Sequence, residues 1–157
     1  MIDAKAFTEL YRGVYRDLYR FALCMMRHPQ DAEDAVSEAV LAAFENVHKL
    51  RNEDAFRSWI FQILANVCKK KLKSMERKEV ELKEEDVSEE MPELTDGLRE
   101  DVQKALLVLS EEERLVVAMS VTAGYNSKEI GNILNLNPST VRSKRKRALE
   151  KMSWVLK

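Results

Sequence analysis

The feature that most constrains the fold is a pair of helix-start signals that lie close together near the carboxyl end. Asn126 and Glu129 match a capping box, in which each side chain accepts a hydrogen bond from the other residue's backbone N–H. Asn137 followed by Pro138 is a second start signal, because Asn caps helices and Pro is favoured at the first helical position. Between them, Asn135 stands where a tight turn requires a positive φ, which asparagine tolerates. The sequence therefore predicts two short helices joined by a tight turn.

The second of these helices is predicted to have an apolar side and a basic side. At about 100° per residue, its inward stripe consists of Val141, Ala148, Met152 and Val155. Arg145 falls near that stripe, so it must snorkel or meet another surface. The other side carries short polar and basic groups, which reach base edges and phosphates in a major groove. We expect DNA contacts from Ser139, Thr140, Arg142, Ser143, Lys144, Lys146 and Arg147. A solvated basic face is the simpler alternative.

The distribution of charge favours a nucleic-acid partner, although the net charge is only −1. Residues 1–75 carry 12 basic and 10 acidic side chains, residues 76–101 carry 4 and 12, and residues 102–157 carry 10 and 5. Two positively biased segments are thus joined by an acidic one. Apolar residues are isolated in the acidic stretch, which also contains a proline and a glycine. We therefore expect residues 77–100 to form a flexible acidic linker.

The segment before this linker is predicted to form three helices. Apolar residues recur every three or four positions over residues 3–27 and again over residues 31–47, where the apolar face includes Phe44. A polar loop follows, and the third helix begins near Ala55 and ends in a cluster of lysines. Trp59 lies on the apolar face of that helix, so we expect it in the core, with base stacking as the alternative.

The polar faces of these helices differ in charge. The outer face of residues 31–47 is mainly acidic, which indicates either simple solvation or a docking surface for a basic partner. The lysine cluster of the third helix follows aromatic residues of the same helix and is expected to lie beside the polar loop. This combination is typical of a surface that follows a nucleic-acid backbone, including that of separated strands.

The carboxyl-terminal segment is predicted to be helical throughout. A short apolar-faced helix is followed by a second capping box, Ser110 with Glu113, and by a helix that ends near Gly124. The predicted fold is therefore all-α, with two small helical domains, residues 1–76 and 101–157, on either side of the linker. Both are near the lower size limit for an independent core, so we expect each to gain stability from a partner.

Several functional classes are disfavoured. No apolar run is long enough to span a membrane, and the amino terminus is a poor signal peptide, so we expect a cytoplasmic protein that is not membrane-embedded. Cys24 and Cys68 lack metal-type spacing and are expected to be reduced, buried thiols. We find no Gly-rich phosphate loop, metal cluster or nucleophile–base pattern. We therefore predict no enzymatic activity, cofactor, metal or small-molecule substrate.

Taken in order, these motifs resemble those of the extracytoplasmic-function sigma factors, the compact two-domain members of the sigma-70 family. Residues 31–44, DAEDAVSEAVLAAF, are similar to the family's region 2 signature. Residues 56–73 match its F-x-x-W-[LI]-x-x-I-x-x-N pattern. The region 4 pattern is matched by Leu109, Arg114, Glu129, Ile130, Thr140, Val141, Arg142, Ser143, Arg147 and Ala148.

The chain also departs from the family pattern at several positions. In the predicted docking helix, Ser37 stands where the family usually has Gln, and Val40 where it usually has an aromatic residue. Lys70 replaces a frequent Asp or Asn. The remaining departures are Asn135 for Gly, Gly131 for Ala and Arg145 for an apolar residue. These differences affect promoter sequence and surface detail rather than the family resemblance.

The resemblance implies that the chain directs bacterial RNA polymerase core to specific promoters and helps to melt them. Its polymerase partners would be the beta-prime clamp and the beta flap, and the linker would thread the nucleic-acid channel. The residues implied in docking on the core are Asp31, Asp34, Ser37, Glu38 and Leu41. The residues implied at the minus-ten element are Lys49, Arg51, Asn52, Asn66, Lys69, Lys70 and Lys73. The helix from Pro138 would read the minus-thirty-five element, and an anti-sigma factor is a further implied partner.

Two other interpretations remain. A free-standing helix-turn-helix regulator would bind operator DNA as a dimer without polymerase, but it leaves the Trp, Asn and Lys pattern of residues 56–73 unexplained. A helical protein-interaction module would not bind DNA even at low salt, where phosphate contacts are strongest.

Overall fold

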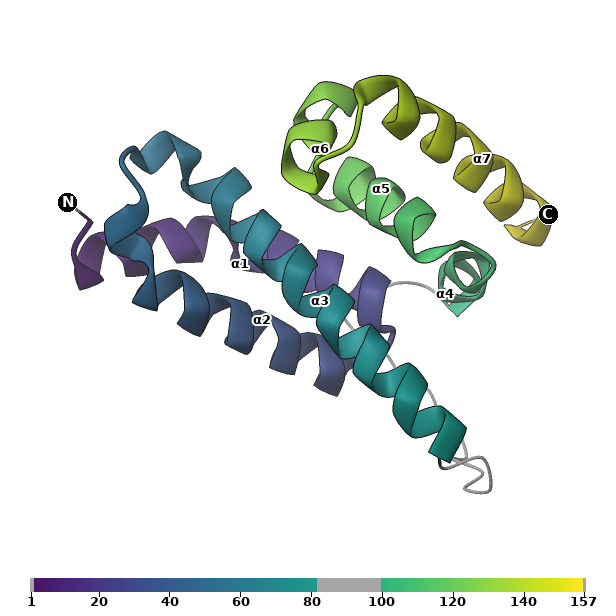
Figure 1. Ribbon diagram of the computed structural model, residues 1–157, viewed down its shortest axis with the longest axis horizontal. Helices are drawn as coiled ribbons and strands as arrows, with labels where there is room; N and C mark the ends of the chain where they lie inside the picture. Colours follow the sequence, from purple (N-terminus) through teal and green to yellow (C-terminus); the bar gives the residue numbers. More distant parts are fainter. Residues whose placement is uncertain (1, 82–99, 157) are drawn as a thin grey trace.

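The computed structural model describes residues 2–81 and 100–156, except for the side chains of residues 77–81, and every regular element in these ranges is a helix. The first group of helices contains α1 (Ala4–Met26), α2 (Pro29–Glu45) and α3 (Phe56–Glu81). The second contains α4 (Glu100–Leu107), α5 (Glu111–Thr122), α6 (Ser127–Leu134) and α7 (Pro138–Leu156). Figure 1 shows the two groups side by side, with α7 on the far side of the second group from α1–α3. The all-α prediction is confirmed.

The element boundaries differ in detail from the predicted ones. Pro29 is the first residue of α2 because a proline, which lacks a backbone N–H, fits the first helical position. The polar loop contains two short 3₁₀ turns, η1 (Val47–Lys49) and η2 (Glu53–Ala55). Helix α3 continues to Glu81, beyond the predicted start of the linker. The rest of that segment, residues 82–99, lies outside the described residues, so the flexible linker stays a prediction.

The turn between α6 and α7 has the predicted local structure. The backbone N–H of Glu129 donates to Asn126 Oδ1 at 2.9 Å, and that of Asn126 donates to Glu129 Oε1 at 3.0 Å. Asn135 adopts a left-handed conformation with φ of 59°. The side chain of Asn137 then caps α7, because its Oδ1 accepts from the backbone N–H of Ser139 at 3.0 Å. These caps satisfy backbone N–H groups that have no partner inside the helices.

Gly131 lies where α6 and the backbone of the following turn approach each other closely. A Cβ atom at residue 131 would lie 2.5 Å from the backbone oxygen of Leu136. We expect Gly131→Ala to lower the free energy of unfolding by about 1–3 kcal/mol, the usual cost of overpacking. Urea denaturation would measure the change. The control is Gly13→Ala on α1, where nothing lies within 4 Å and where alanine should stabilise the helix by roughly 1 kcal/mol. Equal stabilisation by both substitutions would contradict the close approach.

Both groups of helices share one continuous core. Helix α1 packs on α5, and α3 packs on α6, in addition to the contacts within each group. The largest fully buried side chains therefore come from both groups: Phe21, Phe56, Phe61, Leu18, Leu23, Met25, Ile60, Leu64, Leu106, Leu115, Met119 and Ile130.

Two predicted core positions are wrong. Phe44 is 48% exposed because it lies on the rim of a groove between α1 and α2. Val155 is 40% exposed because Met152 is the last buried residue of α7 and Val155 follows in the final turn.

Candidate nucleic-acid interface and docking surface

The outer face of α7 gathers most of the residues predicted to contact duplex DNA. Ser139, Arg142, Ser143, Lys146 and Arg147 are exposed, and Thr140 is half-buried. The inward side is held by the buried residues Val141, Ala148 and Met152, as the helical spacing predicts. Arg145 is half-buried, in agreement with its position near the apolar stripe. The arrangement presents three exposed guanidinium or ammonium groups within two turns, which suits contacts to phosphates and base edges.

Lys144 differs from the other predicted DNA contacts because it faces α5. Its Nζ lies 2.7 Å from Glu112 Oε2, and its side chain is only 21% exposed. Two turns later, Lys151 Nζ donates to Glu113 Oε1 at 2.8 Å. These two ion pairs fix α7 against the first turn of α5, so they orient the exposed face of α7.

Glu113 makes the stability of the contact between α5 and α7 dependent on pH. Its carboxylate is buried and also belongs to the predicted capping box with Ser110, which is confirmed. Burial by itself raises the pKa of Glu113, but the hydrogen bonds from Lys151 and Ser110 outweigh burial and hold the pKa below its ordinary value of 4.5. The stabilisation is therefore complete above pH 4.5 and is lost as the pH falls through the lowered pKa.

We expect this dependence to disappear in a Glu113→Gln variant. The free energy of unfolding of the unaltered chain should exceed that of the variant above about pH 5, and the difference should shrink below pH 4. Urea denaturation between pH 3 and pH 7 would measure it. The control is Glu150→Gln, which removes an exposed carboxylate of α7. A difference that grew on acidification would contradict the assigned role.

The residues predicted at the minus-ten element form two groups joined by a surface of α3. Lys49, Arg51 and Asn52 are exposed in the loop before α3, and Asn66, Lys70 and Lys73 are exposed farther along α3, with Lys69 half-buried. The two groups are separated by roughly 15 Å of helix. Trp59 and Gln62 lie between them. Trp59 is half-buried and packs at a tilt against Phe56, with ring centroids 6.2 Å apart, so it is neither fully core nor a free stacking surface.

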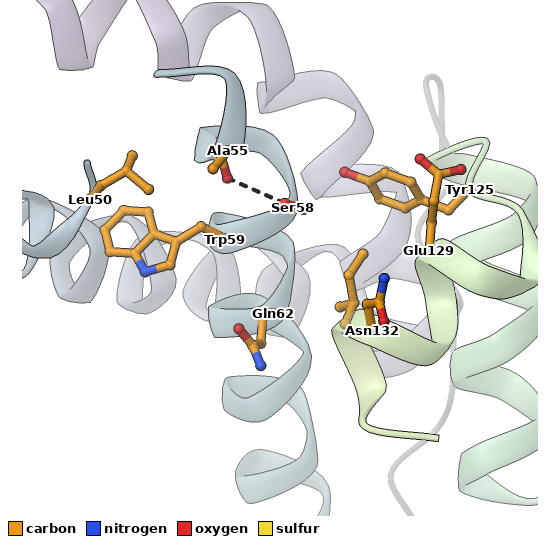
Figure 2. Close-up of a pocket in the computed structure, with 9 residues that line it drawn as sticks. Leu50, Ala55, Ser58, Trp59, Gln62, Tyr125, Glu129 and Asn132 are labelled. Atoms are coloured by element: carbon orange, nitrogen blue, oxygen red, sulfur yellow. Dashed lines mark hydrogen bonds between the residues drawn. The ribbon is translucent and has the colours of Figure 1, made fainter. Parts of the chain in front are cut away.

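A cavity of about 340 Å³ opens on this part of α3. Figure 2 shows Leu50, Ser58, Trp59 and Gln62 on one side and Tyr125, Glu129 and Asn132 on the other. The second side belongs to α6 and the turn before it. Sequence periodicity could not predict that α3 and α6 face each other here, because the two helices are far apart in the sequence.

The residues predicted to dock on polymerase form a continuous strip along α2. Asp34, Ser37, Glu38 and Leu41 are exposed, and Asp31 is half-buried. Ser37 and Leu41 also line a groove of about 480 Å³ between α1 and α2, together with Ala4, Phe7, Thr8, Tyr11, Val40 and Phe44. Leu41 is 59% exposed. The strip therefore has acidic residues at one end and an exposed leucine beside an apolar groove at the other. Such a surface suits a partner that presents both apolar and basic side chains.

The remaining predictions concern the two cysteines, metal sites and membrane-spanning helices. Cys24 and Cys68 are free and buried, and burial raises the pKa of each thiol to about 12, so both are unreactive at neutral pH. Among the described residues, no three His, Cys, Asp or Glu side chains come together as a metal site. No helix in the same part of the chain is long and apolar enough to span a membrane.

Both groups of helices match known protein families. Residues 10–78 match sigma-70 region 2, and residues 99–152 match sigma-70 region 4. The chain is 28% identical over 156 residues to the ECF RNA polymerase sigma factor SigM of Mycobacterium tuberculosis, covering 98% of this chain and 79% of that protein. It is 29% identical over 166 residues to the ECF RNA polymerase sigma-E factor of Escherichia coli, covering 94% and 85%.

The fold has solved counterparts of the same size. The sigma factor RpoE of Bartonella quintana, solved in complex with the anti-sigma factor NepR, superimposes with a TM-score of 0.77 at 22% identity and covers 98% of both chains. The two matched regions occur in the same order as the two groups of helices in Figure 1. This chain therefore belongs to the sigma-70 family, as an extracytoplasmic-function sigma factor.

Proposed function

We propose that this chain directs bacterial RNA polymerase core to specific promoters, with α2 docking on the core, α3 and its preceding loop at the minus-ten element, and α7 at the minus-thirty-five element. The observation that carries the proposal is the separation of these surfaces. The acidic and apolar strip of α2, the basic face of α3 and the basic face of α7 lie on different helices, so one chain can contact polymerase and two DNA segments.

The polymerase core supplies catalysis in this proposal, and the chain supplies promoter selection and strand separation. We assign minus-ten contacts to Lys49, Arg51, Asn52, Asn66, Lys69, Lys70 and Lys73, with Trp59 and Gln62 between them. The anti-sigma factor bound to the Bartonella relative supports a partner of that kind for this chain. We assign the beta-prime clamp to the α2 strip and the beta flap to the second group of helices.

Transcription with sigma-free bacterial core polymerase and genomic DNA tests the proposal. We expect transcript 5′ ends to cluster downstream of shared elements near positions −10 and −35. An Arg142→Ala, Arg147→Ala variant should lose these starts and lower the salt dependence of promoter binding by about two phosphate contacts. The control is Lys104→Ala, which removes an exposed ammonium group of α4.

Two further results separate the alternatives. An Asn66→Ala variant should still bind the promoter but should form less open complex, measured by permanganate reactivity of unpaired thymines. Protection of duplex DNA by the chain alone, without starts in the presence of polymerase, would instead identify a free-standing regulator.

A further inference from the structure

Helix α1 carries a repeated Tyr-Arg pair that belongs to none of the surfaces described above. The pair occurs three times at four-residue spacing, as Tyr11-Arg12, Tyr15-Arg16 and Tyr19-Arg20. Because a helix places residues i and i+4 on the same side, the arginines form one row and the tyrosines form a neighbouring row. Arg12, Arg16 and Arg20, here called the arginine row, are all exposed. Successive arginines are about 6 Å apart along the helix axis, so the row is about 12 Å long.

The charge of the arginine row is not neutralised within the described part of the chain. Like charges at positions i and i+4 of a helix repel each other, and the row contains two such pairs. The acidic residues of α1 are Glu9 and Asp17. Asp17 already pairs with Arg57 of α3 at 3.1 Å, and the ion pairs among the described residues include neither Glu9 nor any arginine of the row. The repulsion therefore weakens the free helix, and an anionic partner would relieve it.

Positive charge continues beyond the row to the end of α1. Arg27 follows Arg16 by eleven residues, or about three helical turns, so it extends the row. Burial, and after it the nearby charge of Arg27, lowers the pKa of Arg114 on α5. The buried Nε atoms of Arg27 and Arg114 have no hydrogen-bond partner in the ranges that the structure describes. This concentration of like charge attracts polyanions to the open side of α1.

The tyrosine row indicates which part of a nucleic acid the arginines contact. Tyr15 stacks on Tyr19, with ring centroids 6.3 Å apart and 16° between the ring planes. It also meets Tyr11 nearly edge to face at 5.5 Å. Because these rings pack mainly on one another, they stiffen α1 instead of serving as platforms for unpaired bases. The contacts are therefore expected to be with backbone phosphates, which duplex DNA presents in every sequence.

An anionic membrane surface fits the arginine row less well than a nucleic acid does. Helices that lie on membranes insert several large apolar side chains beside their basic residues. On α1, Tyr15 is the one large hydrophobic side chain that is exposed. The row also consists of arginines without lysines, and the planar guanidinium of arginine binds two phosphate oxygens at once.

We propose that Arg12, Arg16 and Arg20 bind phosphate groups of duplex DNA, as a nucleic-acid contact separate from those assigned to α3 and α7. Helix α1 packs on α2, α3 and α5, and the row lies on the side that these helices leave open. Figure 1 shows α1 crossing behind α3, with α7 on the far side of the second group. The contact requires neither polymerase nor a promoter element, so it does not rest on the proposed function.

The salt dependence of binding to duplex DNA without promoter elements tests this contact. The full chain would be titrated into a fluorescein-labelled duplex of about 30 base pairs at salt concentrations from roughly 50 to 200 mM. We expect the Arg12→Ala, Arg16→Ala, Arg20→Ala variant to lower the slope of log affinity against log salt by about 2–3, because each phosphate contact contributes about 0.9. The matched control replaces the same three arginines with lysine, which keeps the charges and should retain the slope.

Thermal unfolding followed by circular dichroism separates a lost contact from a damaged fold. The alanine variant should melt at the same temperature as the unaltered chain or higher, because alanine favours helices and the repulsion within the row is removed.

Crosslinking from a single labelled position shows where the DNA lies. Gly13 is exposed between Arg12 and Arg16, and a Cβ atom there would meet nothing within 4 Å. A photoreactive phenyl azide on Gly13→Cys should crosslink the duplex, while the same label on Val121→Cys, at a 72% exposed position of α5, should crosslink it much less. The two native thiols are buried and do not compete for the label.

Several results would overturn the contact. These are an unchanged slope in the alanine variant, an equal loss of slope in the lysine variant, and equal crosslinking from residues 13 and 121. Tighter binding to phosphatidylserine vesicles than to DNA would assign the row to anionic lipid instead. Transcription that fails with the unaltered chain would contradict the proposed function, while the binding measurements on the free chain would still decide this contact.

Discussion

A Phe61→Ala variant is expected to lose about 3–5 kcal/mol of free energy of unfolding, the range for removing a fully buried phenylalanine. The Phe61 side chain is 0% exposed and meets the ring of Phe21 edge to face at 5.9 Å. It also contacts Tyr125 and the guanidinium of Arg57. Because small domains are stable by only about 5–15 kcal/mol, this loss would bring the chain close to unfolding at room temperature. Urea denaturation followed by circular dichroism would measure it.

The matched control for this prediction is Phe44→Ala. Phe44 is also a phenylalanine in the first group of helices, but it is 48% exposed, so its truncation should cost about 1 kcal/mol. The contact between Phe61 and Tyr125 adds a second test. If the two rings stabilise each other across the groups, the Phe61→Ala and Tyr125→Ala effects should fail to add in the double variant. Equal costs for Phe61→Ala and Phe44→Ala would contradict the burial of Phe61.

A Leu41→Glu variant is expected to lose affinity for polymerase core by roughly 30- to 150-fold, which corresponds to about 2–3 kcal/mol at a central apolar contact. Leu41 is 59% exposed and projects from α2 at the edge of the apolar groove. A carboxylate there would be buried without a partner on docking, which is unfavourable. In the free chain the same carboxylate stays in water. The melting temperature should therefore stay unchanged while the affinity falls.

Fluorescence anisotropy of a labelled chain titrated with core polymerase would measure this affinity. The control is the same substitution at Tyr15, a 44% exposed residue of α1 that lies in the same group of helices but outside the α2 strip. We expect Tyr15→Glu to weaken binding less than about threefold. A comparable loss from both substitutions would mean that added negative charge, and not the α2 contact, lowers the affinity.

Features set by neighbouring residues could be predicted from the sequence. Both capping boxes, the cap at Asn137 and the left-handed turn at Asn135 follow from short-range rules, and all are present. Periodicity also identified most of the inward stripes, because a helix places every third or fourth residue on one side. The exposed basic face of α7 was therefore predictable, and the family resemblance is supported by the matches to both regions.

Long-range packing determined the features that short-range sequence signals did not predict. Phe61 is buried because its ring meets two rings from distant parts of the chain, Phe21 of α1 and Tyr125 of the second group. Lys144 is a basic residue of the kind that contacts DNA, but α5 lies close enough for Lys144 to pair with Glu112. The same holds for Arg57, whose partner Ala123 lies 66 residues away. Local sequence determined where helices begin, end and turn, because those signals act within a few residues. Only the tertiary structure decided which surfaces are covered, because periodicity names a face without naming what packs on it.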